Sequence, residues 1–557
     1  MEKTWLKQYP AGVPEHINVD QYTSLTALLD ESFKKYADLP AYKFMGKTFT
    51  FRQVDEASRT FAAYLQTLGL EKGDRVAIMM PNVPQYPIAV AGVLRAGMVV
   101  VNVNPLYTPR ELEHQLKDSG SKAILILENF AATLQACAAA VPTKKIILAA
   151  MGDMLGFPKG MIVNYVVRNV KKLVPAFELP TAVRYNDAIA AGRRAEFKAP
   201  SIKLDDIAVL QYTGGTTGVS KGAVLLHRNL VANTLQAEAW YLPALKKVPA
   251  GEQSMTVCAL PLYHIFGFTS NMMLSMRTGG CNILIPNPRD IPAVFKELSA
   301  HRFHSFPAVN TLFNAMANHA QFNTVDWSHL KISVGGGMAV QQATAKLWLE
   351  KTGCAICEGY GLSETSPSAT CNPTDSTAFT GTIGLPLPST ELTLLDDDGK
   401  EVPLGTPGEI AIRGPQVMAG YWQRPDETAK VMTADGFFRT GDIGTVDANG
   451  YFKIVDRKKD MILVSGFNVY PNEVEDVVTQ MPGVLECAAI GVPDAKAGEA
   501  VKLVIVRKNP ALTEADVRAY CEANMTGYKR PKVIEFRTEL PKTPVGKILR
   551  RELRDKT

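Results

Sequence analysis

Short apolar runs alternate with amphipathic stretches through residue 336, and this alternation restricts the possible folds more than any other feature of the sequence. Runs typical of buried strands occupy residues 75–80, 99–103 and 123–127, and stretches with helical spacing lie between them at 85–97 and 109–120. A helix between two strands returns the chain to the same end of a sheet, so strands connected in this way are parallel. The sequence therefore predicts an α/β fold built on parallel sheets.

The pattern changes twice further along the chain. After residue 380 short strand-like runs separated by turns replace the alternation, which indicates a β-rich subdomain over about 380–455. From residue 456 strand-like runs alternate again with helical stretches, as in a small α+β domain. A chain of 557 residues is too long for one compact core. We expect a large N-terminal domain over residues 1–455 and a separate C-terminal domain over residues 456–557.

Charge and hydropathy argue against several classes of protein. A net charge of +5 gives little support to nucleic-acid binding, which requires a concentrated basic face. No run of ~18 uncharged apolar residues is present for a membrane-spanning helix. Residues 1–20 lack the apolar segment of a secretory signal, so the expected location is the cytoplasm. The eight cysteines include one C-x-x-C pair, Cys354 and Cys357, without further ligands at zinc spacing, and we expect them to be buried thiols.

A stretch rich in glycine and hydroxyl side chains, YTGGTTGVSKGA at residues 212–223, follows the apolar run IAVLQ. Glycines let successive N–H groups converge on an anion, and hydroxyls and a lysine add donors and positive charge. The spacing differs from the Walker A pattern, because Ser220 precedes Lys221 and Gly222 follows it. We predict that the stretch holds phosphate; a turn of glycine and threonine without a ligand is the alternative.

Five further motifs follow this stretch, and the six together resemble the adenylate-forming superfamily of acyl-CoA synthetases, amino-acid adenylation domains and beetle luciferases. The five are GYGLSETSP (359–367), GEIAIRGPQVMAGYW (408–422), DGFFRTGDIG (435–444), DRKKDMILVSGFNVYPNEVE (456–475) and PKTPVGKILRREL (541–553). The resemblance covers residues 25–553, nearly the whole chain. Within it, residues 435–460 are similar to the signature of fatty acyl-CoA synthetases, and the basic segment 151–177 is similar to that of the bacterial long-chain fatty acid–CoA ligases.

This resemblance implies a two-step ligation of a carboxylic acid to coenzyme A, with ATP and coenzyme A as substrates and Mg²⁺ as cofactor. The acid first attacks ATP to give acyl-AMP and pyrophosphate, and the thiol of CoA then displaces AMP. Because a carboxylate is a poor acyl donor, AMP provides the leaving group that attack by a thiol requires. The first step builds charge on phosphate oxygens, so its catalysis depends mainly on positioning and electrostatics.

The resemblance also assigns catalytic and metal-binding roles. Lys547 would bridge the carboxylate and the α-phosphate, and Thr365 would bond the same phosphate. Glu364 would hold Mg²⁺ with Thr213 as a hydroxyl partner, since this hard ion prefers oxygen ligands. Considered without the other motifs, Lys547 could be a solvated lysine in a loop rich in proline and glycine.

Further residues are expected to bind the nucleotide. Tyr360 would stack on adenine, and Asp442, assisted by Arg457, would accept both ribose hydroxyls; a turn cap is the alternative for Asp442. The residues expected to contact ATP or AMP are Thr213, Gly214, Gly215, Thr216, Thr217, Gly218, Ser220, Lys221, Gly336, Gly337, Gly359, Tyr360, Gly361, Glu364, Thr365, Asp442 and Arg457.

Asp456 matches the hinge about which the mobile C-terminal domain of the superfamily rotates between the two steps. A rotation is useful because the site must first exclude water and then admit a thiol. It would withdraw Lys547 from the site. Ser465, Gly466 and Phe467 would then help to form the tunnel for the pantetheine arm of CoA, with Gly466 allowing close approach of the backbone.

The expected acid is a long-chain fatty acid. The stretch PLYHIFGF at 261–268 contains no carboxylate that could pair with the ammonium group of an amino acid. Tyr263 and Phe266 offer apolar surface for an alkyl or aryl tail. His264 would position the acyl carboxylate, unless it is simply a packed histidine. The alternatives are a medium-chain or aryl-acid CoA ligase, a ligase that loads an acyl carrier protein, a luciferase-like oxygenase, and an inactive ATP- or lipid-binding module.

The segment 151–177 combines an apolar second half with four cations, Lys159, Arg168, Lys171 and Lys172. A basic amphipathic helix can lie on an anionic bilayer, and a fatty acid partitions into membranes. We therefore predict peripheral contact with the cytoplasmic face of the membrane; a packed surface helix is the alternative. The expected partners are otherwise the substrates, without nucleic acid, and the sequence is compatible with a homodimer.

Overall fold

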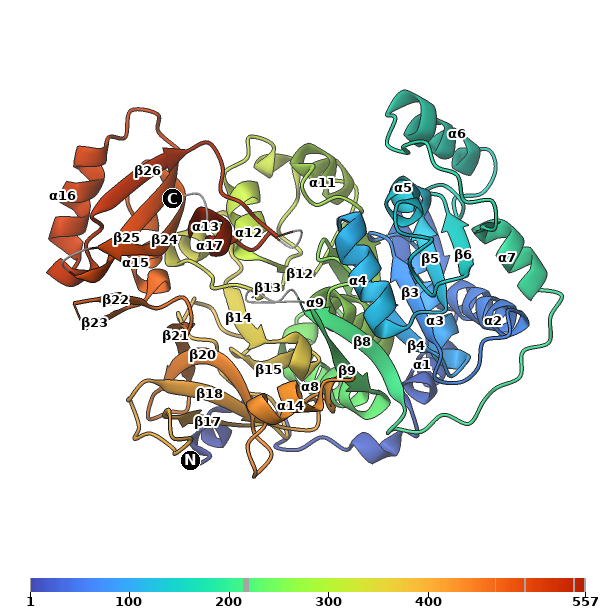
Figure 1. Cartoon of the computed structure of the whole chain (residues 1–557), viewed down its shortest axis with the longest axis horizontal. Coiled ribbons are helices and arrows are strands. Elements are labelled where there is room, and N and C mark those ends of the chain that lie inside the picture. Colours follow the sequence, from blue (N-terminus) through green and yellow to red (C-terminus); the bar gives the residue numbers. More distant parts are fainter. Residues whose placement is uncertain (1, 214–219, 466, 495–496, 544–545, 555–557) are drawn as a thin grey trace.

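The computed structural model describes residues 2–213, 220–465, 467–494, 497–543 and 546–554. Within these residues the strands form four sheets. In Figure 1 the two large sheets occupy the right and the centre of the molecule, and the C-terminal residues form a separate body at the upper left. The α/β class predicted from the sequence is confirmed.

The first large sheet contains the alternation seen between residues 75 and 127. Its order is β19-β9-β8-β4-β3-β5-β6-β7, parallel from β8 to β7, with β9 and β19 antiparallel at the other edge. The strands are β3 (Arg75–Met79), β4 (Val99–Asn102), β5 (Ala123–Leu127), β6 (Lys145–Ala149), β7 (Val183–Arg184), β8 (Ile207–Thr213), β9 (Lys221–Leu226) and β19 (Gly420–Tyr421). The predicted helices are present as α3 (Gln85–Arg95) and α4 (Pro109–Ser119).

The second large sheet has the order β16-β15-β14-β13-β12-β10-β11-β1-β2 and is parallel from β14 to β1. Its strands are β1 (Pro40–Phe44), β2 (Lys47–Thr50), β10 (Met255–Cys258), β11 (Cys281–Leu284), β12 (Ser305–Ala308), β13 (Ile332–Gly335), β14 (Ile356–Gly361), β15 (Ser368–Cys371) and β16 (Leu385–Pro386). The helices α12 (Asn310–Ala317) and α13 (Gln342–Thr352) follow β12 and β13. The two helices lie on the side of the sheet that faces the C-terminal body (Figure 1).

The main core lies between the two large sheets, and helix α3 is enclosed in it. Every residue of α3 is buried, which explains why its sequence is apolar on all sides. The remaining helices of the N-terminal part are α1 (Leu25–Lys35), α2 (Phe51–Thr67), α5 (Ala131–Gln135), α6 (Lys159–Tyr165), α7 (Tyr185–Gly192), α8 (His227–Leu245), α9 (Ile265–Gly267), α10 (Leu274–Thr278), α11 (Ile291–Leu298) and α14 (Pro425–Val431). Two π-helical turns, η4 (Val166–Val170) and η5 (Phe268–Met273), continue α6 and α9.

Local sequence signals account for the ends of α4. The hydroxyl of Thr108 accepts from the N–H of Glu111, and the Glu111 carboxylate accepts from the N–H of Thr108 at 2.8 Å. Pro109 occupies the first turn, where no N–H is needed, and Gly120 ends the helix at a φ of +61°. These signals begin and end the helix at the residues predicted from the sequence.

Residues after 386 form a four-stranded antiparallel sheet in the order β17-β18-β20-β21. Its strands are β17 (Glu391–Leu395), β18 (Gly408–Arg413), β20 (Phe438–Val446) and β21 (Phe452–Arg457). This sheet is the β-rich part expected over about 380–455. The boundary predicted at residue 456 falls inside β21, where Asp456 pairs with Ile443.

The C-terminal body contains its own sheet and core. Its strands are β22 (Ile462–Val464), β23 (Phe467–Val469), β24 (Val484–Asp494), β25 (Gly498–Arg507) and β26 (Val533–Arg537), and its helices are α15 (Pro471–Thr479), α16 (Glu514–Asn524) and α17 (Arg550–Arg554). Apolar side chains of β24, β25, α15 and α16 form the core of this body. This arrangement matches the predicted α+β character of the last hundred or so residues.

Two predictions from composition can be compared with the fold. All eight cysteines are buried and free, as expected. Among the described residues, no helix combines the length and hydropathy needed to cross a bilayer.

Candidate active site

The carboxyl ends of parallel strands from both large sheets lie close to one another. Thr213 ends β8, and the turn η7 (Ser363–Thr365), which follows β14, packs against β8 and β9. Ligands of α/β proteins bind at this end of parallel strands. The sheet geometry therefore places most of the predicted nucleotide-binding motifs in one region.

Lys547 reaches this region from the C-terminal body. The N–H of Lys547 donates to the hydroxyl of Thr543 at 3.0 Å, and its carbonyl accepts from the N–H of Thr543 at 2.7 Å, so the loop is closed at its base. Burial and the positive charge of Arg457 lower the pKa of Lys547 to about 7, and Asp442 acts in the opposite direction. The charge of Lys547 also contributes, after burial, to a lowered pKa for His264. The structure thus buries the predicted catalytic lysine within electrostatic range of three other predicted site residues.

Asp442, Tyr360 and Arg457 form a hydrogen-bonded and ionic group. The hydroxyl of Tyr360 donates to Oδ2 of Asp442 at 2.7 Å, and Nε of Arg457 lies 3.3 Å from Oδ1. Asp442 on β20 pairs directly with Arg457 on β21, so the register of the antiparallel sheet sets this geometry. Each carboxylate oxygen keeps a further lone pair, which is the arrangement that acceptance from two vicinal hydroxyls requires.

Glu364 is buried in the turn η7, and burial raises the pKa of its carboxyl group. The hydroxyl of Tyr421 on β19 donates to Oε1 of Glu364 at 2.8 Å. The carboxylate of Glu364 and the hydroxyl of Thr213 are oxygen donors of the kind that a hard cation such as Mg²⁺ prefers. Tyr421 was not predicted as a site residue, although it lies in the motif at 408–422.

Three predicted phosphate contacts are engaged elsewhere in this structure. The hydroxyl of Thr365 donates to the carbonyl of Pro367 within its own turn, so bonding a phosphate requires this side chain to rotate. The ammonium group of Lys221 pairs with Glu427 on α14 and lies 5.1 Å from the centre of the Tyr421 ring. Ser220 donates its hydroxyl to the carbonyl of Thr213. The predicted residues Gly214, Gly215, Thr216, Thr217 and Gly218 lie outside the described residues, as does Gly466.

The predicted glycines fill positions of close backbone approach. A Cβ on Gly361 would lie 1.8 Å from the carbonyl oxygen of Pro367, and one on Gly336 would lie 3.0 Å from the ring of Phe266 and 3.2 Å from the carbonyl of Gly359. Gly337 has a φ of +77°, a conformation that favours glycine. Phe266 therefore lies against the loop after β13, where it can form one wall of an acyl site.

His264 is held in a defined tautomer. Its Nδ1 accepts from the N–H of Phe266 at 3.2 Å, so the neutral ring carries its proton on Nε2. Burial lowers the pKa of His264 to about 4, which keeps the ring neutral at physiological pH. The ring can therefore donate a hydrogen bond to a carboxylate oxygen. Tyr263 beside it is buried, and its carbonyl accepts from Gln211 at 3.2 Å.

Two of the predicted CoA-binding residues, Ser465 and Phe467, are exposed in this structure. Phe467 is 56% exposed and stacks on Tyr528 with ring centres 4.7 Å apart. Ser465 donates its N–H to the carbonyl of Ala497 at 2.8 Å, at the end of the β22–β23 hairpin. Ser465 and Phe467 therefore belong to the exposed surface of the C-terminal body in this arrangement.

Asp456 is completely buried where the two parts of the chain meet. Its carboxylate accepts from the N–H of Arg457 at 2.6 Å and from that of Asn472 at 2.8 Å, and Arg550 lies 3.6 Å away. Burial raises the pKa of this carboxyl group to about 6. Its backbone belongs to the β-rich sheet while its carboxylate bonds to α15, so Asp456 physically links the two bodies.

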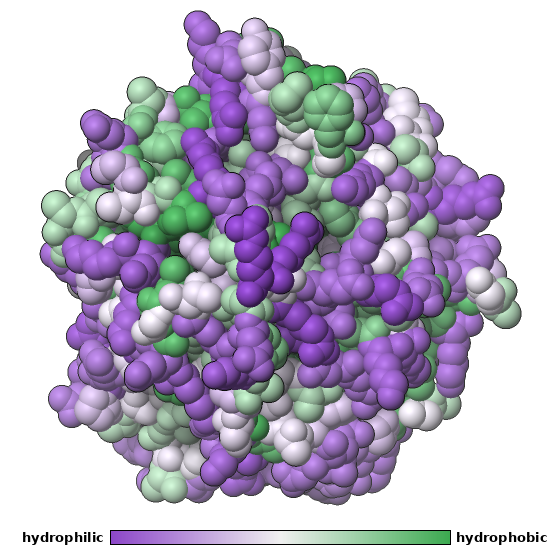
Figure 2. Space-filling view, turned by 90° about the vertical axis from the view of Figure 1, so that its right-hand side faces the viewer, coloured by the Kyte–Doolittle hydropathy of each residue, from purple (hydrophilic) through white to green (hydrophobic). Residues whose placement is uncertain are grey.

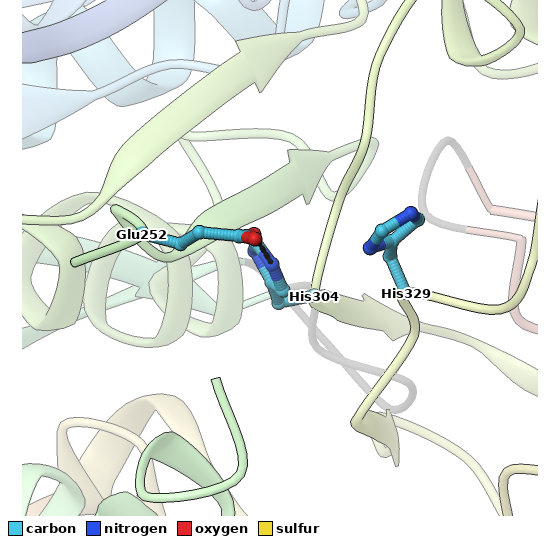
Figure 3. A group of neighbouring side chains, drawn as sticks. All are labelled: Glu252, His304 and His329. Atoms are coloured by element: carbon cyan, nitrogen blue, oxygen red, sulfur yellow. Dashed lines mark ion pairs between the residues drawn. The ribbon is translucent and has the colours of Figure 1, made fainter. Parts of the chain in front are cut away.

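The described residues also bring together three side chains of types that bind metals, Glu252, His304 and His329 (Figure 3). They precede β10, β12 and β13, at the amino ends of these strands and away from the nucleotide motifs. The N–H of Met255 donates to Nδ1 of His304 at 3.1 Å, so the proton of the neutral ring is on Nε2, which faces Glu252 at 3.4 Å. A nitrogen that carries a proton cannot bind a metal. This geometry fits an interaction between His304 and Glu252 and does not fit a metal centre.

A large α/β part, a small C-terminal body and a lysine shared between them define the class of adenylate-forming enzymes. Residues 29–422 match the sequence profile of the AMP-binding enzymes, and residues 473–547 match that of the AMP-binding enzyme C-terminal domain. The chain belongs to the AMP-binding enzyme family.

Individual relatives agree with this assignment over the whole chain. A long-chain-fatty-acid–CoA ligase of Escherichia coli O6:H1 is 55% identical over 556 residues, covering 100% of this chain and 98% of the relative. A crystal structure of the anthranilate CoA ligase AuaEII with anthranoyl-AMP matches with a TM-score of 0.85 at 27% identity, covering 97% of this chain and 99% of that one.

A further comparison bears on the arrangement of the two bodies. ATP-bound MatB of Rhodopseudomonas palustris matches with a TM-score of 0.81 at 30% identity, over 96% of this chain and 99% of that one. Apo MatB, also at 30% identity, matches with a TM-score of 0.73 over 97% and 99%. Over the whole chain the structure is thus more similar to ATP-bound MatB than to apo MatB.

Proposed function

We propose that the protein is an AMP-forming long-chain fatty acid–CoA ligase that activates fatty acids for degradation or lipid synthesis. The observation that carries this proposal is the position of Lys547, which the C-terminal body buries within electrostatic range of His264, Asp442 and Arg457. A module that only binds a nucleotide does not require a lysine that a second body places in the site. Identity of 55% over the full chain to a long-chain-fatty-acid–CoA ligase supports the choice of acid.

In the first step the site residues would bind and orient the acid and ATP, and they would neutralise charge on the phosphates. The Nε2–H of His264 would donate to the acyl carboxylate and direct its other oxygen at the α-phosphate. Lys547 would contact both groups and stabilise the charge that develops on the phosphate oxygens. Mg²⁺, when bound, would neutralise charge on the phosphates of ATP, and Glu364 with Thr213 would supply oxygen ligands for it.

In the second step Lys547 would leave the site and CoA would enter. The thiol would attack the acyl carbon, AMP would depart, and acyl-CoA would form. The exposed position of Phe467 and Ser465 in the present arrangement supports a rotation between the steps, because these residues can line a thiol tunnel only after the C-terminal body turns. Residues 1–455 and 456–557 would then be the two rigid bodies, with Asp456 between them.

The chain length of the acid can be tested directly. We expect CoA-dependent release of AMP to be faster with C14–C18 acids than with acetate, hexanoate or benzoate when kcat/KM is compared across the series. Replacing CoA by a phosphopantetheinylated acyl carrier protein is the control for a carrier-loading ligase. A maximum at C6–C8 or with benzoate would replace the long-chain proposal by a medium-chain or aryl-acid one, and the two-step mechanism would stand.

The lowered pKa of Lys547 predicts how adenylation depends on pH. The ammonium cation is present below about pH 7 and is lost above it, whereas His264 stays neutral throughout. We therefore expect kcat/KM for pyrophosphate release, which reports the free enzyme, to fall about tenfold for each pH unit above the pKa. Lys547→Arg, whose guanidinium stays charged, should be slower but independent of pH between 6 and 9. The same decline in this variant would assign the titration to another group.

We also propose that α6 and η4 dock on the membrane surface, mainly through apolar side chains. Phe157 is 88% exposed, Tyr165 62% and Val170 64%, and Met161 and Ile162 are exposed beside them. Figure 2 shows hydrophobic atoms gathered at the top of this face, where α6 protrudes in Figure 1. Protruding apolar side chains are what insertion into the headgroup region of a bilayer requires.

The four cations of this segment contribute unequally, contrary to the sequence-based view of them as one group. Arg168 pairs with the buried Glu128 through two hydrogen bonds of 2.7 and 2.9 Å, and Lys159 donates to the carbonyl of Met45. Lys171 and Lys172 are exposed. These two lysines can add ~1 kcal/mol each to binding at an anionic surface.

Vesicle co-sedimentation distinguishes the two contributions. The triple variant Phe157→Ser, Ile162→Ser and Tyr165→Ser should lose binding to vesicles that contain phosphatidylglycerol. The double variant Lys171→Gln and Lys172→Gln should weaken binding about tenfold or more, and only at low salt. Leu404→Ser is the matched control, because Leu404 is an exposed apolar residue far along the chain. Wild-type protein that does not sediment would leave α6 as an ordinary surface helix.

A further inference from the structure

One face of helix α12 is polar and bonds to three separate segments of the C-terminal body. Thr311, Asn314 and Asn318 are spaced i, i+3 and i+7, so they lie on the same side of the helix. The hydroxyl of Thr311 donates to the carbonyl of Gly546 at 3.1 Å, and the amide of Asn314 donates to the carbonyl of Leu485 at 3.0 Å. Asn318 accepts from the ammonium group of Lys508 at 2.6 Å. We call these three residues the α12 face.

The contact of Thr311 lies next to the catalytic lysine. Gly546 directly precedes Lys547, and a Cβ on Gly546 would lie 2.7 Å from Oγ1 of Thr311 and 3.2 Å from Val309. Gly546 also has a φ of +85°, which favours glycine. The loop can therefore rest directly on the first turn of α12.

Helix α12 is itself fixed to the candidate active site. It follows β12, and Asn310 forms two hydrogen bonds with Gln341 at the start of α13. The Nδ2 of Asn310 donates to Oε1 of Gln341 at 3.1 Å, and the backbone N–H of Gln341 donates to Oδ1 of Asn310 at 3.0 Å. The carbonyl of Ala308 accepts from the N–H of Gly336, in the loop that packs on Phe266. Helix α12 therefore connects the loop that carries Lys547 to the loop after β13, which lines the predicted acyl site.

We propose that Thr311 is a positioning residue for the adenylation step and that Asn314 and Asn318 extend the same docking face. Its hydroxyl anchors the backbone one residue before Lys547, so it sets how far the ammonium group reaches toward the carboxylate and the α-phosphate. Displacement of a catalytic group by about 1 Å can cost ~10²-fold in rate. The contact exists only while the C-terminal body is docked, so the second half-reaction does not use it. This inference rests on the proposed two-step function.

The test compares the two half-reactions in the full-length protein. Thr311→Val keeps the shape of the side chain and removes the donor. We expect it to lower the single-turnover rate of acyl-AMP formation about tenfold, which corresponds to ~1.4 kcal/mol and lies within the range for one hydrogen bond. The rate of thioester formation from supplied acyl-AMP and CoA should stay within twofold of wild type. Thr311→Ser, which restores the hydroxyl, should recover most of the adenylation rate.

Three further measurements make the result decisive. Asn314→Leu should reproduce the selective loss, and Ala315→Ser, on the exposed side of the same helix, should change neither half-reaction. Thermal unfolding of each variant checks that the fold is retained. Equal losses of rate in both half-reactions, or no recovery of the rate in Thr311→Ser, would mean that Thr311 has only a structural role. A wild-type protein that forms no acyl-AMP would instead overturn the proposed function.

Discussion

Replacing Lys547 with alanine is expected to lower the rate of acyl-AMP formation by ~10²–10³-fold, the largest effect of any single substitution considered for this protein. The lysine is buried within electrostatic range of His264, Asp442 and Arg457, where its cation can act on the reacting oxygens. Thioester formation from supplied acyl-AMP should be nearly unchanged, because the proposed rotation removes the lysine before CoA enters. Pyrophosphate release and thioester absorbance measure the two steps separately.

A matched control exists within the same loop. Lys542 pairs with Glu486 at 2.7 Å on the C-terminal body, so Lys542→Ala removes a loop lysine without touching the candidate site. This variant should keep wild-type adenylation. Equal losses at Lys542 and Lys547, or loss of both half-reactions in Lys547→Ala, would contradict the assigned role.

Glu364→Gln is expected to have the second largest effect, a loss of ~10²–10³-fold in adenylation. The change keeps the size of the side chain and removes the negative charge that a divalent cation requires at this buried position. Raising the Mg²⁺ concentration should recover part of the lost activity. Direct binding of MgATP, measured by calorimetry, should weaken in parallel.

Tyr421→Phe provides a graded comparison for Glu364. It removes the hydroxyl that donates to Oε1 at 2.8 Å but leaves the carboxylate in place. We expect an adenylation rate near wild type at saturating Mg²⁺ and a severalfold higher Mg²⁺ concentration at half-maximal rate. If Glu364→Gln binds MgATP as tightly as wild type does, the proposed metal role of Glu364 is wrong.

The fold could be predicted from the sequence because its signals are local. Strand-like runs such as 75–80 and 123–127, and the helix signals of Thr108 and Gly120, act over a few residues and hold in the structure. The order of strands in the sheets could not be predicted, because β8 pairs with β4 across about a hundred residues. Such pairings depend on the packing of the whole core.

For the candidate site, too, the local features could be predicted from the sequence and the long-range contacts could not. Motifs identified Lys547, Asp442 and Glu364, and the structure places them near the ends of the parallel strands. The contacts of Thr311 with Gly546 and of Arg168 with Glu128 were missed, since nothing in either short sequence context indicates its partner. Sequence motifs thus predicted which groups carry the chemistry, and the structure was needed to show which residues contact them.

The pairing of Arg457 with Asp442 has a thermodynamic consequence. Arg457 directly follows the proposed pivot, whereas Asp442 belongs to the sheet that stays in place, so a turn at Asp456 separates the two charges. A ribose held between them would then favour one orientation of the C-terminal body over the other. By linkage, the orientation must alter nucleotide affinity by the same factor by which the nucleotide shifts the orientation. The departure of Lys547 from the site and a weaker affinity for AMP would therefore both result from a single coupling free energy.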